Sequence, residues 1–182
     1  MQKKFFQLYY FVDEYNYSDL IRLSKNIHII YRNYKKNFDI STLISLKNFC
    51  KENNLKLFLS NNIKLALKYR LNGIYIPAFN NEINYIKHNV PSDFRIIGSA
   101  HNFKEILIKY KQGCKLIFLS PVFKVKKTNN FLNISKFNLL TLNKKVKFIA
   151  LGGIKKSNLS KIKLLNVVGL ASISFFQKKT AP

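Results

Sequence analysis

Two adjacent glycines, Gly152 and Gly153, follow a short apolar run and form the most specific chemical pattern in the chain. Because glycine has no side chain, backbone N–H groups at such a pair can approach an anion closely. The N-terminus of a following helix would add a partial positive charge. The next apolar run ends near Ser174, which could donate to the same ligand through its hydroxyl or its backbone. The pattern predicts a phosphate-binding turn, and a tight turn that binds nothing is the alternative.

These residues must be positioned by the elements around them, and short apolar runs alternate with helix-like segments along the whole chain. The runs that predict β-strands are 7–12, 28–31, 55–59, 73–76, 94–97, 115–119, 146–151 and 167–173. The segments that predict helices are 17–25, 41–53, 63–69, 82–87, 103–110, 134–142 and 157–165, and a short terminal helix is expected after the last strand. Ser41 and Asn102 are the expected N-caps of two of these helices.

Eight strand–helix units predict a single domain over residues 1–182, folded as a compact α/β (β/α)8 TIM barrel with trimmed helices. A doubly wound open sheet would also alternate in this way. The count of eight, and the lack of a GxGxxG turn after the first strand, favour the barrel. In such barrels the active site lies at the C-terminal ends of the strands, often with a phosphate site after strands seven and eight. Gly152, Gly153 and Ser174 fall on those two loops, so we expect a ligand that carries phosphate.

The chain is strongly basic, with 32 Lys and Arg against 8 Asp and Glu and a formal net charge of +24. Proteins that read bases depend on arginine, whereas here most of the cations are lysines spread along the whole length. This dispersal argues against a nucleic-acid partner and for a solvated exterior. No apolar stretch reaches 18 residues and no signal pattern begins the chain, so we expect no membrane partner and a cytoplasmic location. Cys50 and Cys114 are expected to be buried free thiols.

Seven segments of the sequence form a pattern together: LYYFVD at 8–13, FLSNNIKLAL at 58–67, NGIYI at 72–76, IIGSAH at 96–101, SPVF at 120–123, ALGGI at 150–154 and GLASIS at 169–174. In their order and spacing they resemble the thiamine phosphate synthase family and its relatives, the thiazole tautomerases. The resemblance implies a (β/α)8 barrel that joins hydroxymethylpyrimidine diphosphate to thiazole phosphate, giving thiamine phosphate and pyrophosphate with Mg²⁺. It implies small phosphorylated pyrimidine and thiazole compounds as partners, and a homo-oligomer is left open.

The resemblance also assigns roles to individual residues. Arg32 matches the family's arginine that contacts diphosphate after the second strand, and His101 matches the histidine after the fifth; these two are the candidate catalytic residues. Three lysines lie in the loop after the sixth strand, where they could bind diphosphate as point charges. The candidate substrate- and phosphate-binding residues are Gly152, Gly153, Ser174, Lys124, Lys126, Lys127 and Asn61.

Two positions depart from the family pattern in a way that bears on the metal. Asn61 and Asn80 stand where the family carries aspartates that bind Mg²⁺. Because Mg²⁺ prefers carboxylate and phosphate oxygens, this pair is a weak candidate metal site and Mg²⁺ a weakly supported cofactor. Two other functions therefore stay open: a thiazole-phosphate tautomerase, with His101 as proton shuttle, and a non-catalytic binder of a phosphorylated ligand on the same barrel.

Overall fold

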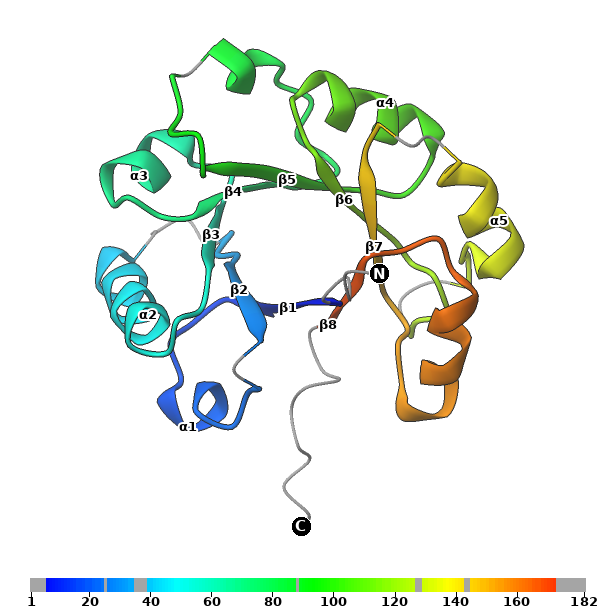
Figure 1. Ribbon diagram of the computed structural model, residues 1–182, viewed down its shortest axis with the longest axis horizontal. Helices are drawn as coiled ribbons and strands as arrows, with labels where there is room; N and C mark the ends of the chain where they lie inside the picture. The colour runs from blue at the N-terminus through cyan, green and yellow to red at the C-terminus, as the bar shows by residue number, and fades with distance from the viewer. Residues whose placement is uncertain are drawn as a thin grey trace, which may run out of the picture.

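Eight parallel strands close into a barrel in the order of the sequence, as the computed structural model shows for residues 6–24, 26–34, 39–87, 89–126, 129–142 and 145–172 (Figure 1). The strands are β1 (Gln7–Val12), β2 (Ile27–Tyr31), β3 (Leu57–Ser60), β4 (Gly73–Ile76), β5 (Arg95–Ala100), β6 (Leu116–Leu119), β7 (Lys147–Leu151) and β8 (Gly169–Ser172). β8 pairs in parallel with β1, with Leu8 opposite Leu170, and this pairing completes the ring. The predicted barrel is confirmed, and the open sheet is excluded.

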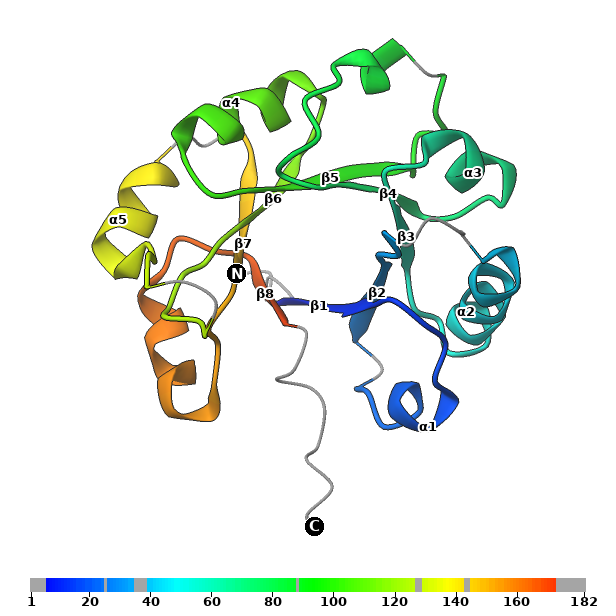
Figure 2. The same ribbon diagram turned by 180° about the vertical axis from the view of Figure 1, so that it is seen from behind.

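Helices surround the barrel in both views (Figures 1 and 2). They are α1 (Tyr17–Leu20), α2 (Ile40–Glu52), α3 (Ile63–Lys68), α4 (Phe103–Lys111) and α5 (Asn133–Leu140), with two 3-10 helices, η1 (Asn84–Lys87) and η2 (Lys156–Leu164). Thus the segments expected to be helical near 82–87 and 157–165 are of the tighter 3-10 type. These short elements explain how eight units fit into 182 residues.

One expected helix cap is confirmed and one is wrong. The Asn102 side chain accepts from the Glu105 N–H at 3.0 Å and caps α4. On α2, however, the Asp39 carboxylate accepts from the backbone N–H groups of Ser41 and Thr42, so Asp39 is the cap. The Asp39 carboxylate accepts from two N–H groups that have no partner within the helix, and its negative charge interacts favourably with the positive end of the helix dipole. A serine hydroxyl carries no such charge.

The interior of the barrel is filled by side chains, with aromatic rings meeting edge to face. The ring centroids of Phe11 and Tyr75 lie 5.2 Å apart, and those of Tyr75 and Phe118 lie 5.7 Å apart. A second apolar cluster lies between the strands and the helices and contains Cys50 and Cys114, which are buried free thiols as predicted. Rings and aliphatic side chains therefore fill the interior, and the candidate site lies at the mouth of the barrel, where the C-terminal ends of the strands meet.

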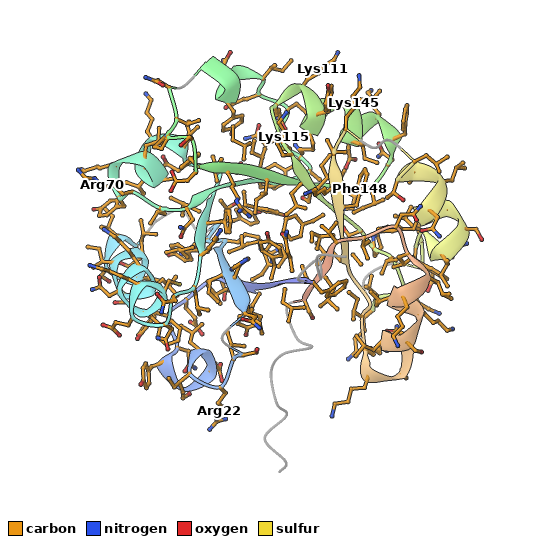
Figure 3. All side chains as sticks on the ribbon, viewed as in Figure 1. Arg22, Arg70, Lys111, Lys115, Lys145 and Phe148 are labelled. Atoms are coloured by element: carbon orange, nitrogen blue, oxygen red, sulfur yellow. The ribbon has the colours of Figure 1, made fainter. Side chains whose placement is uncertain are left out.

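Apart from Lys109, which is buried, the described lysines and arginines are spread over the outside of the molecule. Figure 3 shows Arg22, Arg70 and Lys111 at the rim of helices and turns, well away from one another. Among the described residues, no helix combines the length and the apolar character needed to cross a bilayer.

Candidate active site

The turn after β7 is built so that only glycine fits it. Gly152 and Gly153 have φ angles of 87° and 71°, in the left-handed region that side chains disfavour. A Cβ added to Gly153 would lie 2.6 Å from the carbonyl carbon of Phe123, and one added to Gly152 would lie 2.8 Å from Cβ of Pro121. The glycines therefore let the β7 turn lie directly against the loop that follows β6.

Hydrogen bonds hold this glycine turn on both sides. The Phe123 N–H donates to the Gly152 carbonyl at 3.2 Å. The Asn158 side chain donates to the Gly153 carbonyl at 2.8 Å and accepts from the Lys155 N–H at 2.8 Å, where η2 begins. The turn is therefore fixed before any ligand binds, and this preorganisation suits an anion-binding turn.

β8 brings its C-terminal end beside the glycine turn, because Leu151 of β7 pairs with Ala171 of β8. The structure describes β8 as far as Ser172. Ser174, the expected third member of the phosphate cradle, lies outside the described residues and stays a prediction. What the structure brings together is the glycine turn and the end of the strand that leads to Ser174.

Arg32 follows β2 at the mouth, and its side chain lies against two aromatic rings. The guanidinium carbon lies 4.9 Å from the ring centroid of Phe11 and 5.8 Å from that of Tyr34. The Tyr34 ring meets Phe79 edge to face at 5.6 Å, and these two side chains are 52% and 68% exposed. These cation–π contacts hold the guanidinium group of Arg32 in place through its face. The N–H donors point outward along its edge, where they can bind a phosphate.

Asn61 and Asn80 meet at the mouth, although they follow different strands. The Asn80 side-chain amide donates to Asn61 Oδ1 at 3.0 Å and to the Tyr85 hydroxyl at 2.7 Å. Asn61 has a φ of 64°, and its N–H donates to the Tyr75 carbonyl at 3.0 Å, so the turn after β3 is fixed against β4. An adjoining cavity of about 390 Å³ is lined by Asn61, Asn62, Ile63, Lys64, Glu82, Asn84 and Tyr85.

This amide pair does not fit Mg²⁺. The Oδ1 atom of Asn61 already accepts from Asn80, and Oδ1 of Asn80 accepts from the Glu82 N–H at 2.9 Å. Mg²⁺ demands octahedral oxygen ligands and favours carboxylates, which neither residue supplies. The described part of the chain also holds no group of three His, Cys, Asp or Glu side chains that could bind a metal ion. The two asparagines therefore do not form a magnesium site.

His101 lies just beyond β5 and is anchored to the first turn of α4. Its Nδ1 lies 2.9 Å from Glu105 Oε2, and its backbone N–H donates to the same oxygen at 2.8 Å. The imidazole is 52% exposed and lines a groove of about 370 Å³ that also includes Pro121, Phe131 and Lys136. Through Pro121 this groove adjoins the glycine turn, whereas Arg32 and the amide pair do not line it.

The loop after β6 carries the expected lysines. Lys124 and Lys126 are exposed, and a Cβ on Gly153 would lie 2.8 Å from the Lys124 carbonyl oxygen. Lys127 lies outside the described residues. The two described lysines thus project from the loop that supports the glycine turn, where they can attract an anion without forming part of the turn itself.

Two features of the site were not predicted from the sequence: the hydrogen bond between Tyr75 and Ser99 beneath the mouth, and the contact between the rings of Tyr34 and Phe79 beside it. The Tyr75 hydroxyl donates to Ser99 Oγ at 2.8 Å inside the barrel, and burial raises the pKa of Tyr75. The strand alternation of residues 73–76 could have placed Tyr75 inward. Tyr34 and Phe79 lie on loops far apart in the sequence, so no local sequence pattern could have predicted their contact.

Comparison with known proteins now identifies the family. The family model for thiamine monophosphate synthase matches residues 25–176. Thiamine-phosphate synthase of Prochlorococcus marinus strain SARG is 30% identical over 132 residues, which cover 71% of this chain and 38% of the relative. The Clostridium perfringens enzyme of the same name is 28% identical and covers 71% of this chain and 63% of its own length. The chain spans less than half the length of the three Prochlorococcus relatives, 38%, 44% and 47%.

Solved structures agree on the fold. Thiamine phosphate pyrophosphorylase from Pyrococcus furiosus superposes with a TM-score of 0.72 at 19% identity, covering 94% of this chain and 87% of its own. A 4-hydroxy-2-oxoglutarate aldolase barrel superposes with a TM-score of 0.68 at 16% identity, covering 97% of this chain and 88% of its own. At such identities the likeness shows the barrel and no more, so the family assignment comes from the sequence match. The chain belongs to the thiamine monophosphate synthase family.

Proposed function

We propose that this protein is a thiamine phosphate synthase-type transferase. It would join hydroxymethylpyrimidine diphosphate to thiazole phosphate and release pyrophosphate. The observation that carries the proposal is the preformed glycine turn at Gly152 and Gly153, separated from Arg32 only by β8 and β1 around the mouth. Two anion-binding elements at neighbouring parts of one mouth suit a reaction between two phosphorylated substrates.

In the proposed reaction the C–O bond between the pyrimidine methylene and the diphosphate breaks, and both electrons leave with pyrophosphate. The ring nitrogen of the thiazole then attacks the pyrimidine cation. Arg32 would stabilise the leaving anion with its N–H donors, and Lys124 and Lys126 would add positive charge. The glycine turn would hold the thiazole phosphate so that the nitrogen lies close to the cation. No protein nucleophile is needed.

The alternative with an observation of its own is a thiazole-phosphate tautomerase. The carboxylate of Glu105 holds His101 at Nδ1, and a histidine oriented in this way suits proton transfer. For either activity we propose one domain over residues 1–182 that acts in the cytoplasm on small phosphorylated pyrimidine and thiazole compounds. A homo-oligomer remains open.

Incubation of the protein with both phosphorylated precursors tests the proposal. A synthase forms thiamine phosphate, and Arg32→Ala sharply reduces its formation while His101→Ala does not abolish it. A tautomerase isomerises the thiazole alone and loses this activity in His101→Ala. A protein that thiazole phosphate stabilises against heat, but that forms no product in either assay, is a binder, and the synthase proposal fails.

A further inference from the structure

Lys109, on α4, is buried to 0% exposure, the one charged side chain among the described ones to lie in the core. Its ammonium group donates to the backbone carbonyl of Asn80 at 2.6 Å and to Gln112 Oε1 at 2.9 Å. Burying an ammonium group is costly unless hydrogen bonds replace its water. The lysine therefore lies in a position where its contacts with the loop after β4 must offset a large desolvation cost.

Gln112, at the C-terminal end of α4, is also fully buried and reinforces the same loop. Its side-chain amide donates to the Asn80 carbonyl at 2.9 Å and to the Glu82 carbonyl at 2.8 Å. Two side chains of one helix thus place three hydrogen bonds on the backbone of residues 80–82. No strand supplies these carbonyls with partners, because β4 ends at Ile76.

The barrel makes room for the lysine at Gly98 of β5. A Cβ on Gly98 would lie 2.9 Å from Cδ of Lys109 and 2.9 Å from Sγ of Cys114. Burial lowers the pKa of Lys109 to about 8, and the neighbouring Cys114 and Glu105 oppose this shift. The ammonium form therefore predominates at neutral pH, when the lysine can donate all of its hydrogen bonds.

The loop held by these bonds carries the amide pair of the mouth. The Asn80 backbone is fixed by α4, and its side chain reaches Asn61 and Tyr85. We propose that Lys109, together with Gln112, is a positioning residue that orders the loop after β4 and thereby holds Asn80 against Asn61. The Lys109 ammonium group then orders the part of the mouth formed by Asn61 and Asn80, the pair that does not fit Mg²⁺.

Hydrogen exchange in the unliganded full chain tests the proposal without reference to activity. Lys109→Met keeps the length of the side chain and removes its donors, and Gln112→Leu removes the second set of donors together with the Oε1 atom that accepts from Lys109. In each variant we expect the backbone amides of Asn80 and Glu82, which donate to the Pro77 carbonyl and to Asn80 Oδ1, to exchange about tenfold faster, or more, than in the wild type, while those of α2 stay unchanged. Leu46→Ala, a core truncation on α2, is the matched control and leaves the exchange of the Asn80 and Glu82 amides unchanged.

Exchange of the Asn80 and Glu82 amides that matches the wild type in the variants that fold, or that rises equally in Leu46→Ala, overturns the proposal. If Lys109→Met does not fold, Gln112→Leu alone decides.

A second readout, resting on the proposed synthase function, separates positioning from general destabilisation. We assign the pyrimidine diphosphate to the side of the mouth where Arg32 and Asn61 follow the adjacent strands β2 and β3. In Gln112→Leu its KM rises severalfold, while the KM for thiazole phosphate, bound at the glycine turn after β7, stays within about twofold. An equal rise in both KM values contradicts the positioning role. If the wild type forms no product, the synthase proposal fails, and hydrogen exchange still decides the role of Lys109.

Discussion

Replacing Gly153 by alanine should disrupt the β7 turn more than a substitution of one methyl group normally would. The residue has a φ of 71°, and a Cβ there would lie 2.6 Å from the carbonyl carbon of Phe123 and 2.8 Å from the carbonyl oxygen of Lys124. Both atoms belong to backbone, which cannot rotate away as a flexible side chain can. The alanine must therefore push the β7 turn and the β6 loop apart.

Two contributions set the size of the effect. The left-handed conformation costs a residue with a side chain about 1–2 kcal/mol. Overpacking against a well-packed neighbour costs about 1–3 kcal/mol more. Their sum predicts that Gly153→Ala lowers the free energy of unfolding by about 2–5 kcal/mol. The separation of the two loops should also weaken binding of thiazole phosphate.

Urea unfolding of the variant and the wild type, with calorimetric titration of thiazole phosphate, measures both effects. Gly113→Ala is the control for the backbone contribution, because Gly113 has a φ of 84° in the turn after α4, away from the mouth. We expect Gly113→Ala to lose stability but to bind thiazole phosphate as the wild type does. A Gly153→Ala protein that loses less than about 1 kcal/mol and binds normally would refute the reasoning about the turn.

Three further predictions concern the mouth and the floor of the barrel. Arg32→Ala should lower kcat/KM for the pyrimidine diphosphate about 10- to 100-fold in steady-state assays, with partial recovery in Arg32→Lys, and an unchanged kcat/KM would remove Arg32 from the site. Tyr75→Phe should lower the free energy of unfolding by about 1 kcal/mol in urea, because the buried Ser99 hydroxyl loses its partner at 2.8 Å; an unchanged midpoint contradicts this. Burial lowers the pKa of His28 to about 4, so the native state binds fewer protons than the unfolded chain, and the free energy of unfolding should fall as pH drops from about 6.5 towards 4. His28→Phe should flatten this part of the pH profile, and an unchanged profile would rule out His28 as its source.

The barrel could be predicted from sequence because its signals are local. Each strand is a short apolar run, and two adjacent glycines predict the turn after β7. The ends of helices were harder to predict, because several polar residues near a helix start can act as its cap. The cap of α2 is Asp39, two residues before the expected Ser41.

The site could be predicted only in part, because much of it depends on contacts between distant segments. The resemblance placed Asn61 and Asn80 at equivalent strand ends, but the bond between their side chains needs the folded loops. Lys109 sits on an amphipathic helix in a chain rich in solvated lysines, so nothing local marked it as buried. Ser174 and Lys127 lie outside the described residues, and their roles stay predictions.

Pyrophosphate release measured against thiamine phosphate formation tests the proposed transfer most directly. With both precursors present, we expect one pyrophosphate for each thiamine phosphate, and an equal fall in both products in Arg32→Ala. With the pyrimidine diphosphate alone, we expect no thiamine phosphate. Pyrophosphate release that is the same with and without thiazole phosphate, and no thiamine phosphate in either case, would contradict a coupled transfer at this barrel mouth.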